Sequence, residues 1–221
     1  DLVLWIALGV ILGGRLGYAL FYKPSLYAQL FTGEGWSKLE LFQMWSGGMS
    51  FHGGLIGVTL AIVWFANRQK INLLSLGDLV APVVPIGLFF GRIANFINGE
   101  LIGRVTDVPW AMIFPPMLGL GPEPRHPSAL YEFALEGVVL FVVLWWVSRK
   151  PQTQGLISGL FLLLYGTFRF IVEFVRLPDP QLCFIAFDWL TMGQLLTVPM
   201  LAAGAFLVTT ACRSQRTMVA T

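Results

Sequence analysis

Charged residues are scarce in this sequence: 12% of its 221 residues are Asp, Glu, Lys or Arg, against 56% hydrophobic residues. Fourteen basic and twelve acidic residues leave a formal net charge of only +2, too small for a domain that binds nucleic acid through its phosphates. So high an apolar fraction also excludes intrinsic disorder. We therefore expect no nucleic-acid partner and surroundings more apolar than water.

Cysteine and metal-binding motifs are equally scarce. Cys183 and Cys212 have no partner spacing, there is no CxxC or HExxH, and His52 and His126 are far apart. The GxSxG elbow, the Walker loop and the GxGxxG fingerprint are missing too, which argues against acyl-serine, nucleotide and dinucleotide chemistry. We expect no metal and no cofactor, so other side chains must carry any chemistry.

Six hydrophobic stretches approach the roughly 20 residues that a helix needs to cross a hydrocarbon core about 30 Å thick. They lie at 2–22, 53–66, 76–97, 129–147, 155–174 and 192–211. The second is short, and extending it back over 45–52, where glycines permit a bend or close packing, would supply the missing length. Without a repeat or linker, the sequence predicts one all-α, polytopic membrane domain over residues 1–221.

Basic residues in the short connections predict the topology. Segments 67–75 and 148–154 and the tail after 211 carry Lys and Arg without an acid, so we expect them, and the C-terminus, on the cytoplasmic side. Segments 23–44, 98–128 and 175–191 mix both signs and should face the periplasm. Because a membrane helix begins at once, without an initiator Met, the sequence is expected to be a fragment.

Many polar side chains fall inside or beside these stretches, where a charge costs roughly 2.5–3.5 kcal/mol on insertion scales. They are Arg15, His52, Asp78, Arg92, Asn95, Asn98, Glu132, Glu136, Arg169 and Glu173. Their density predicts a polar cavity, and the position of several of them at outward ends predicts that it opens toward the periplasm.

Tyr165, Arg169 and Glu173 recur every four residues and so share one helix face, where Arg169 and Glu173 could pair. The pair could serve a site or merely neutralise itself within the bundle. Glu132 and Glu136 raise the same question, and for them a structural role is favoured, with a carboxylate bracing an arginine of a neighbouring helix.

The strongest signal is GRIANFINGELIGR, residues 91–104, at the outward end of the third stretch. Arg92 and Asn95 share a helix face, and Asn98 and Glu100 follow where the helix should unwind. A guanidinium fork beside amide donors and glycine-exposed N–H groups suits the phosphate of a lipid headgroup. The alternative is a helix end that caps itself with Asn and extends Arg to the interface.

A second cluster, SGGMSFHGGLIG at 46–57, places His52 amid small residues. Its imidazole can exchange a proton near neutral pH, although a lone histidine is more often a hydrogen-bonding structural residue. His126, between Pro124 and Pro127, is expected to be a rigid loop feature.

Four segments resemble one known family: HGGLIG at 52–57, GRIANFINGELIGR at 91–104, RHPSALYE at 125–132 and YGTFRFIVEFVRLPD at 165–179. The chain is similar to bacterial phosphatidylglycerol–prolipoprotein diacylglyceryl transferases, whose signature is the second block. The resemblance covers nearly the whole chain. One departure is Ala94, where the signature commonly has glycine.

The resemblance implies transfer of the diacylglyceryl group of phosphatidylglycerol to the lipobox cysteine thiol of a preprolipoprotein, forming a thioether and releasing glycerol 1-phosphate. The expected partners are therefore phosphatidylglycerol, a signal peptide with a lipobox cysteine, and the lipid bilayer. It also implies seven transmembrane helices in an inner membrane. One helix, with a His-x-Tyr-Gly-type motif, would then precede Asp1.

For this reaction, residue chemistry assigns Arg92, supported by Asn95, to the lipid headgroup, and Arg169 to thiolate generation or leaving-group stabilisation. His52 is the alternative proton acceptor. Tyr165 and Glu173 are expected to orient Arg169. The loop that binds the headgroup is expected to be shaped by Asn98, Glu100, Gly103 and Arg104. Arg15 and Glu132 are expected to have a supporting role. A transporter or channel would also use buried charges, but the chain lacks an internal repeat and its polar residues gather toward one face.

Overall fold

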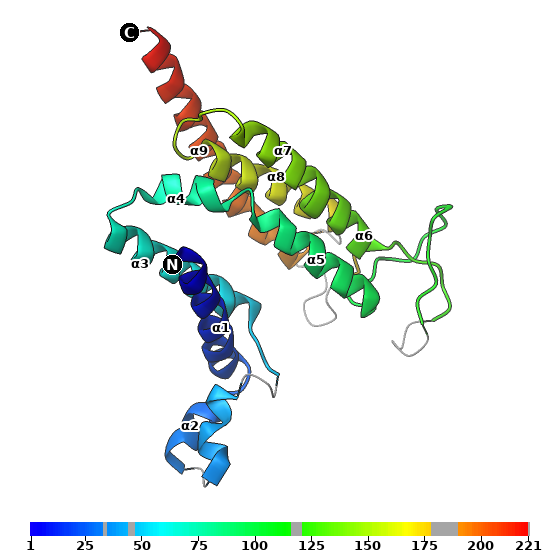
Figure 1. Ribbon diagram of the computed structural model, residues 1–221. Helices are drawn as coiled ribbons and strands as arrows, with labels where there is room; N and C mark the ends of the chain where they lie inside the picture. Colours follow the sequence, from blue (N-terminus) through cyan, green and yellow to red (C-terminus); the bar gives the residue numbers. More distant parts are fainter. Residues whose placement is uncertain (33–34, 44–46, 116–120, 178–189, 221) are drawn as a thin grey trace. The chain divides into compact units, whose positions relative to one another are not determined.

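The computed structural model describes residues 1–32, 35–43, 47–115, 121–177 and 190–220 of the chain. In these residues helices dominate, and the only extended pairings are isolated antiparallel bridges (Figure 1). The chain forms two compact units, Asp1–Leu76 and Gly77–Thr221. Each is described by itself.

The first unit contains α1 (Leu2–Phe21), α2 (Ser25–Thr32), the 3₁₀ helix η1 (Gly35–Phe42) and α3 (Phe51–Gln69). Glycines let the backbones of α1 and α3 touch: a Cβ on Gly9 would lie 2.7 Å from the Gly57 carbonyl oxygen, and one on Gly17 would lie 2.5 Å from Gly53 Cα. Small residues at four-residue spacing are typical of packed helices in membranes.

Helix α3 differs from the prediction at its start. The expected extension back over 45–52 holds only for Phe51 and His52, because Ser50 is extended and caps the helix, accepting a hydrogen bond from Gly53 N at 3.2 Å. Residues 45 and 46 lie outside the described residues. The additional length lies at the other end, where α3 runs past the predicted residue 66 to Gln69 and stops at Lys70 in a left-handed conformation, φ 57°.

The second unit holds the remaining helices apart from the start of α4 (Leu73–Val80). The others are α5 (Val84–Ile97), α6 (Ser128–Glu132), the π-helix η4 (Phe133–Val139), α7 (Leu140–Ser148), α8 (Leu156–Val172) and α9 (Met192–Ala220). In this unit α5 packs against η4, and α8 against α7 and α9 (Figure 1). Helix α4 begins in the last residues of the first unit.

The third hydrophobic stretch is not one straight helix. Helices α4 and α5 are bent by 44° at a short break. Pro82 lies in that break and Pro85 in the first turn of α5, where its missing N–H costs nothing. The prolines explain why a continuous apolar run forms two helices.

The fourth stretch is a continuous run from Ser128 to Ser148 with a π-helical insertion in its middle. Such insertions shift the following side chains around the helix axis and are frequent at functional sites. Glu136 lies within this insertion, and Glu132 immediately precedes it.

Three described helices are long and apolar enough to cross a membrane: Leu2–Phe21, Ser128–Ser148 and Met192–Gln215. The bent pair α4–α5 would make a fourth. Helix α8 is apolar but has only 17 residues. The chain is thus an all-helical, multi-pass membrane protein in its described part, and the count of six spans stays a prediction.

Asp78, expected among the buried charges of a cavity, instead caps a helix. Its carboxylate accepts hydrogen bonds from Gly155 N at 2.6 Å, Ser158 N at 2.8 Å and Ser158 Oγ at 2.7 Å. These N–H groups belong to the first turn of α8, which has no carbonyl partners for them within the helix. Asp78 on α4 therefore fixes the start of α8.

Replacing this cap should destabilise the fold without touching the chemistry. We expect Asp78→Ala to lower the free energy of unfolding by about 1–2 kcal/mol, because three donors lose a charged acceptor. Thermal unfolding of the detergent-solubilised protein measures the loss, and Asp78→Asn, which keeps one acceptor, should lose less. Equal melting temperatures for Asp78→Ala and the unmodified chain would contradict the capping role.

Candidate active site

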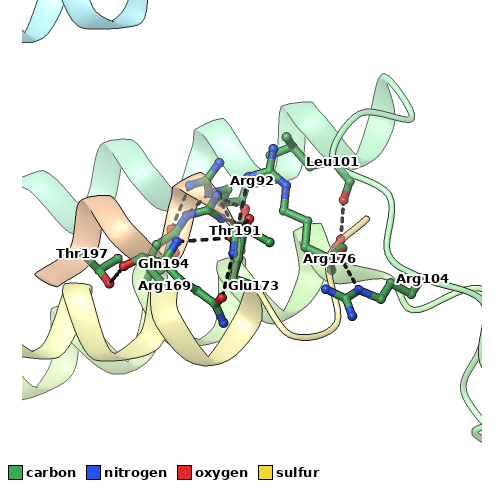
Figure 2. A network of polar contacts seen from close by, with 12 residues as sticks. Arg92, Leu101, Arg104, Arg169, Glu173, Arg176, Thr191, Gln194 and Thr197 are labelled. Carbon is green, nitrogen blue, oxygen red and sulfur yellow. Dashed lines mark hydrogen bonds and ion pairs between the residues drawn. The ribbon is translucent and has the colours of Figure 1, made fainter. Parts of the chain in front are cut away.

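Arginines and glutamates of α5, α6, η4 and α8 form one chain of ion pairs inside the second unit (Figure 2). At its centre lies Glu132, whose side chain is fully buried. Its Oε2 lies 3.0 Å from Nε of Arg92, and its Oε1 pairs with Nη1 of Arg169. One carboxylate thus joins an arginine of α5 to an arginine of α8, which confirms the expectation that a glutamate of this helix braces neighbouring arginines.

Each arginine has a second carboxylate. Glu136 Oε2 accepts hydrogen bonds from Arg92 Nη2 at 2.9 Å and Nε at 3.2 Å. Glu173 Oε2 lies 2.9 Å from Nη2 of Arg169, which confirms the pair expected from their four-residue spacing. The arrangement holds each guanidinium at two points, as a planar fork allows.

Among these ion-paired residues, the arginines are more exposed than the glutamates. Arg92 is 17% and Arg169 14% exposed, whereas Glu132 and Glu136 are 0% and Glu173 7% exposed. The carboxylates therefore lie behind the guanidinium groups. An anionic ligand that reaches the site meets the arginines first, and these are already oriented by the buried glutamates.

Arg176 joins the far end of this chain, with Nη1 3.9 Å from Glu173 Oε2. Arg176 was not predicted as a site residue, although its spacing of three residues from Glu173 and seven from Arg169 was the available signal. Thr191 was also missed. Its hydroxyl donates to Glu173 Oε1 at 2.9 Å across 18 residues of sequence, so no local spacing indicates it.

At the end of the signature helix, Asn95 has a different partner from the one predicted. Asn95, expected to support Arg92, donates from Nδ2 to Glu100 Oε2 at 2.7 Å. Helix α5 ends at Ile97, and Gly99 follows in a left-handed conformation, φ 68°, which turns the chain back toward Asn95. Exposed Asn98 is the C-cap, and its N–H bonds to Ala94 O at 2.9 Å.

The last residues of the signature, Gly103 and Arg104, form hydrogen bonds with two other segments of the chain. Gly103 N donates to His126 O at 3.0 Å, and a Cβ at Gly103 would lie 2.6 Å from His126 Cβ, so only glycine fits. Arg104 donates from its backbone N to Val175 O at 2.8 Å and from Nε to Arg176 O at 3.0 Å. The loop is therefore anchored to the chain that leaves α8.

His126 is a fixed loop residue, as expected. Its Nδ1 lies 3.0 Å from the hydroxyl of Tyr131, which also accepts a hydrogen bond from Trp110 Nε1 at 2.6 Å. Together with the backbone bond to Gly103, these contacts hold the loop against the start of the fourth stretch.

Tyr165 lies one turn before Arg169 on α8. Its ring stacks on Phe161, with centroids 5.7 Å apart, and packs against the buried core that contains Leu140 and Leu144. Its expected role in orienting Arg169 stays a prediction.

Two predicted residues belong to the first unit. His52 lies exposed in the first turn of α3, and its catalytic role stays a prediction. Arg15 is buried, and its three guanidinium nitrogens donate to backbone carbonyls: Nε to Leu41 at 2.9 Å, Nη2 to Glu40 at 2.6 Å, and Nη1 to Gly48 at 3.1 Å and to Gly47. Arg15 therefore fastens the segment before α3 onto α1, which is a structural role.

The remaining predictions concern cysteine, metal and the cavity. Cys212 is a free, exposed thiol on α9, and Cys183 lies outside the described residues. Within the described ranges no three His, Cys, Asp or Glu side chains gather as a metal site would require. A cavity of about 590 Å³ in the first unit has apolar walls, including Trp5 and Trp64, so the expected polar cavity stays a prediction.

Apolar helices long enough to span a membrane, with a chain of arginines and buried glutamates in the second unit, define a membrane protein. The family model described as prolipoprotein diacylglyceryl transferase matches residues 1–210. The chain belongs to that family, which confirms the resemblance found in its motifs.

Relatives bear the same name. The phosphatidylglycerol–prolipoprotein diacylglyceryl transferase of Chromohalobacter salexigens is 66% identical over 204 residues, 92% of this chain and 73% of that protein. The Pseudomonas entomophila protein of this name is 58% identical over 221 residues, 100% of this chain and 80% of its own length. The Pseudomonas aeruginosa protein is 58% identical over 213 residues, covering 96% and 76%.

Proposed function

We propose that this chain transfers the diacylglyceryl group of phosphatidylglycerol to the lipobox cysteine of a preprolipoprotein, forming a thioether and releasing glycerol 1-phosphate. The observation that carries the proposal is the pair of partly exposed guanidinium groups, Arg92 and Arg169, held by the single buried carboxylate of Glu132. Membership of the transferase family supplies the reaction.

The reaction is a displacement at a saturated glyceryl carbon. The sulfur of the substrate cysteine forms the new C–S bond, the C–O bond to the phosphate breaks, and its electron pair goes to the leaving phosphate oxygen. The thiol proton goes to a base. Charge therefore moves from sulfur to phosphate, and positioned cations stabilise both ends of that movement.

Arg92 is assigned to the headgroup phosphate. Its Nε and Nη2 hold Glu132 and Glu136, so the third nitrogen, Nη1, is the one we assign to a phosphate oxygen. The signature loop is assigned to the rest of the headgroup, with Asn95 and Glu100 closing its first turn and Arg104 anchoring its end.

Arg169 is assigned to the thiolate or the leaving oxygen, as an electrostatic partner. A guanidinium keeps its proton at all ordinary pH values, so Arg169 is a poor literal base. A thiol with a pKa near 8.5 is only a few per cent ionised at neutral pH, and a nearby cation raises that fraction. His52 is the proposed proton acceptor, and Tyr165 the proposed support of Arg169.

We place the chain in a bacterial inner membrane as a single transferase domain with six spans of a seven-span pattern. The loop charges support a cytoplasmic C-terminus and a signature near the periplasmic face, with the polar cavity open to that side.

The test is transfer by the purified protein from phosphatidylglycerol to a lipobox peptide, with a Cys→Ser peptide as the control. A mass increase equal to one diacylglyceryl group on the cysteine peptide alone supports the proposal. The competing function, transport through a polar cavity, predicts instead an unmodified peptide together with solute uptake by sealed proteoliposomes.

The two cysteines of the chain should be dispensable, because the attacking sulfur belongs to the substrate. We expect the double substitution Cys183→Ser, Cys212→Ser to keep the transfer rate within about twofold of the unmodified chain. Loss of activity in this variant, with folding intact, would mean that a thiol of the enzyme takes part in the reaction.

A further inference from the structure

The first turn of α9 is built around Thr191 and Gln194. Thr191 Oγ1 accepts a hydrogen bond from Gln194 N at 3.3 Å, and Gln194 Oε1 accepts one from Thr191 N at 3.1 Å. This reciprocal arrangement is a capping box, which satisfies two N–H groups that the helix cannot bond internally. Both residues are buried, so the cap lies inside the helix packing.

The same threonine hydroxyl also reaches the ion-pair chain. It donates to Glu173 Oε1 at 2.9 Å, so one oxygen of this buried carboxylate is fixed by α9 (Figure 2). The other oxygen, Oε2, faces Arg169 Nη2 at 2.9 Å. Glu173 therefore links α9 to Arg169: one carboxylate oxygen bonds Thr191 and the other pairs with the guanidinium.

Gly193 brings the backbone of α9 directly against this carboxylate. A Cβ at Gly193 would lie 2.8 Å from Glu173 Cδ and Oε1, and 2.9 Å from Oε2. Real side chains do not approach so closely, so any larger residue displaces the carboxylate. The absence of a side chain at this position is therefore part of how Glu173 is held.

Arg169 is consequently clamped from two sides. Nη1 pairs with Glu132 of α6, and Nη2 pairs with Glu173, which α9 holds. Two fixed contacts define the plane of a guanidinium, whereas one leaves it free to rotate.

We propose that Thr191 and Gly193 are positioning residues for the transfer reaction: they fix Glu173, which fixes the Arg169 guanidinium in the orientation that stabilises the transition state. This inference rests on the proposed role of Arg169. It adds a fifth element, α9, to a site otherwise built from α5, α6, η4 and α8.

The test compares four variants in the lipobox-peptide assay. Thr191→Val removes the hydroxyl, and Gly193→Ala keeps the cap but displaces the carboxylate. Their controls are Thr197→Val, whose hydroxyl donates to Gln194 O at 2.7 Å, and Gly87→Ala, where among the described residues a Cβ meets open space. We expect about a tenfold fall in kcat with an unchanged KM for Thr191→Val and Gly193→Ala, and less than a twofold change for the controls.

Two further measurements separate positioning from general damage. Thr191→Ser restores the hydroxyl and should restore kcat. In a Glu173→Gln background, Thr191→Val should lower kcat no further, because both changes act through one carboxylate. Gly193→Ala is expected to lower the melting temperature, because it displaces a buried carboxylate, so all rates are compared at a temperature below the melting transition of every variant.

Arg169→Lys, measured in the same assay, distinguishes the proposed role of Arg169 from the positioning role of Thr191 and Gly193. If Arg169→Lys is inactive while Thr191→Val and Gly193→Ala keep kcat within twofold, the positioning role is wrong and the role of Arg169 stands. If Arg169→Lys keeps full turnover, the role of Arg169 and the positioning role are both wrong.

Discussion

Arg92→Lys is expected to lower kcat by about 100-fold, although it keeps the positive charge. Arg92 uses Nε and Nη2 to hold Glu132 and Glu136, and Nη1 is the nitrogen that we assign to a phosphate oxygen. A lysine has one nitrogen at the end of a flexible chain, so it cannot hold two carboxylates and a phosphate in fixed directions. The loss should therefore come from geometry, with the net charge unchanged.

The measurement is the initial rate of diacylglyceryl transfer at saturating phosphatidylglycerol. Arg149→Lys, at an exposed arginine that follows α7, is the matched control and should behave like the unmodified chain. Turnover near the unmodified rate for Arg92→Lys would remove the assignment of Arg92 to the headgroup.

Glu132→Gln should have the largest combined effect on stability and activity. Glu132 is fully buried and pairs with both Arg92 and Arg169, so an amide at this position leaves both guanidinium groups without one of their neutralising carboxylates. Removing one partner of a buried ion pair costs about 3–5 kcal/mol, and we expect a loss of about 3 kcal/mol in the free energy of unfolding. We also expect kcat to fall by about 100-fold, because both arginines lose their shared orientation.

Glu123→Gln is the matched control, since the Glu123 side chain is 58% exposed, although its partner Arg125, 3.2 Å away, is buried. Water screens the exposed Glu123 carboxylate, so this change should shift stability by less than about 1 kcal/mol and leave the rate unchanged. Thermal unfolding in detergent and the transfer rate below the melting transition measure both effects. Equal behaviour of Glu132→Gln and Glu123→Gln would contradict a central role for Glu132.

The ion-pair chain was partly predictable because helical spacing is a local property. Arg169 and Glu173 are four residues apart, and the structure pairs them at 2.9 Å. That Glu132 braces an arginine was also expected from a buried carboxylate in an apolar helix. Which arginines it joins could not be derived, because that depends on how α5, α6 and α8 pack.

Contacts that cross between distant segments escaped prediction for the same reason. Nothing in the local sequence links Thr191 to Glu173, or Asp78 to the first turn of α8. Asn95 was assigned to Arg92 because both share a face of an ideal helix. The helix ends at Ile97, and the reversed chain brings Glu100 to Asn95 instead.

The spans show where counting apolar residues is insufficient. Hydrophobicity located the stretch at 76–97, but Pro82 and Pro85 divide it into two helices bent by 44°. Likewise, α3 begins at Phe51 because a serine cap, and not the apolar pattern, decides its first residue. The family and its reaction came from specific motifs, and the match over residues 1–210 confirms that identification.

The most direct test of the account follows two labels in one lipid. Phosphatidylglycerol is labelled with one isotope in its acyl chains and another in its terminal glycerol, and is incubated with the purified protein and a lipobox peptide. Displacement at the glyceryl carbon predicts that the acyl label appears on the peptide cysteine and the glycerol label in soluble glycerol phosphate, in equal amounts. Acyl label on the peptide without an equivalent release of glycerol phosphate, or release without peptide modification, would contradict displacement at the glyceryl carbon.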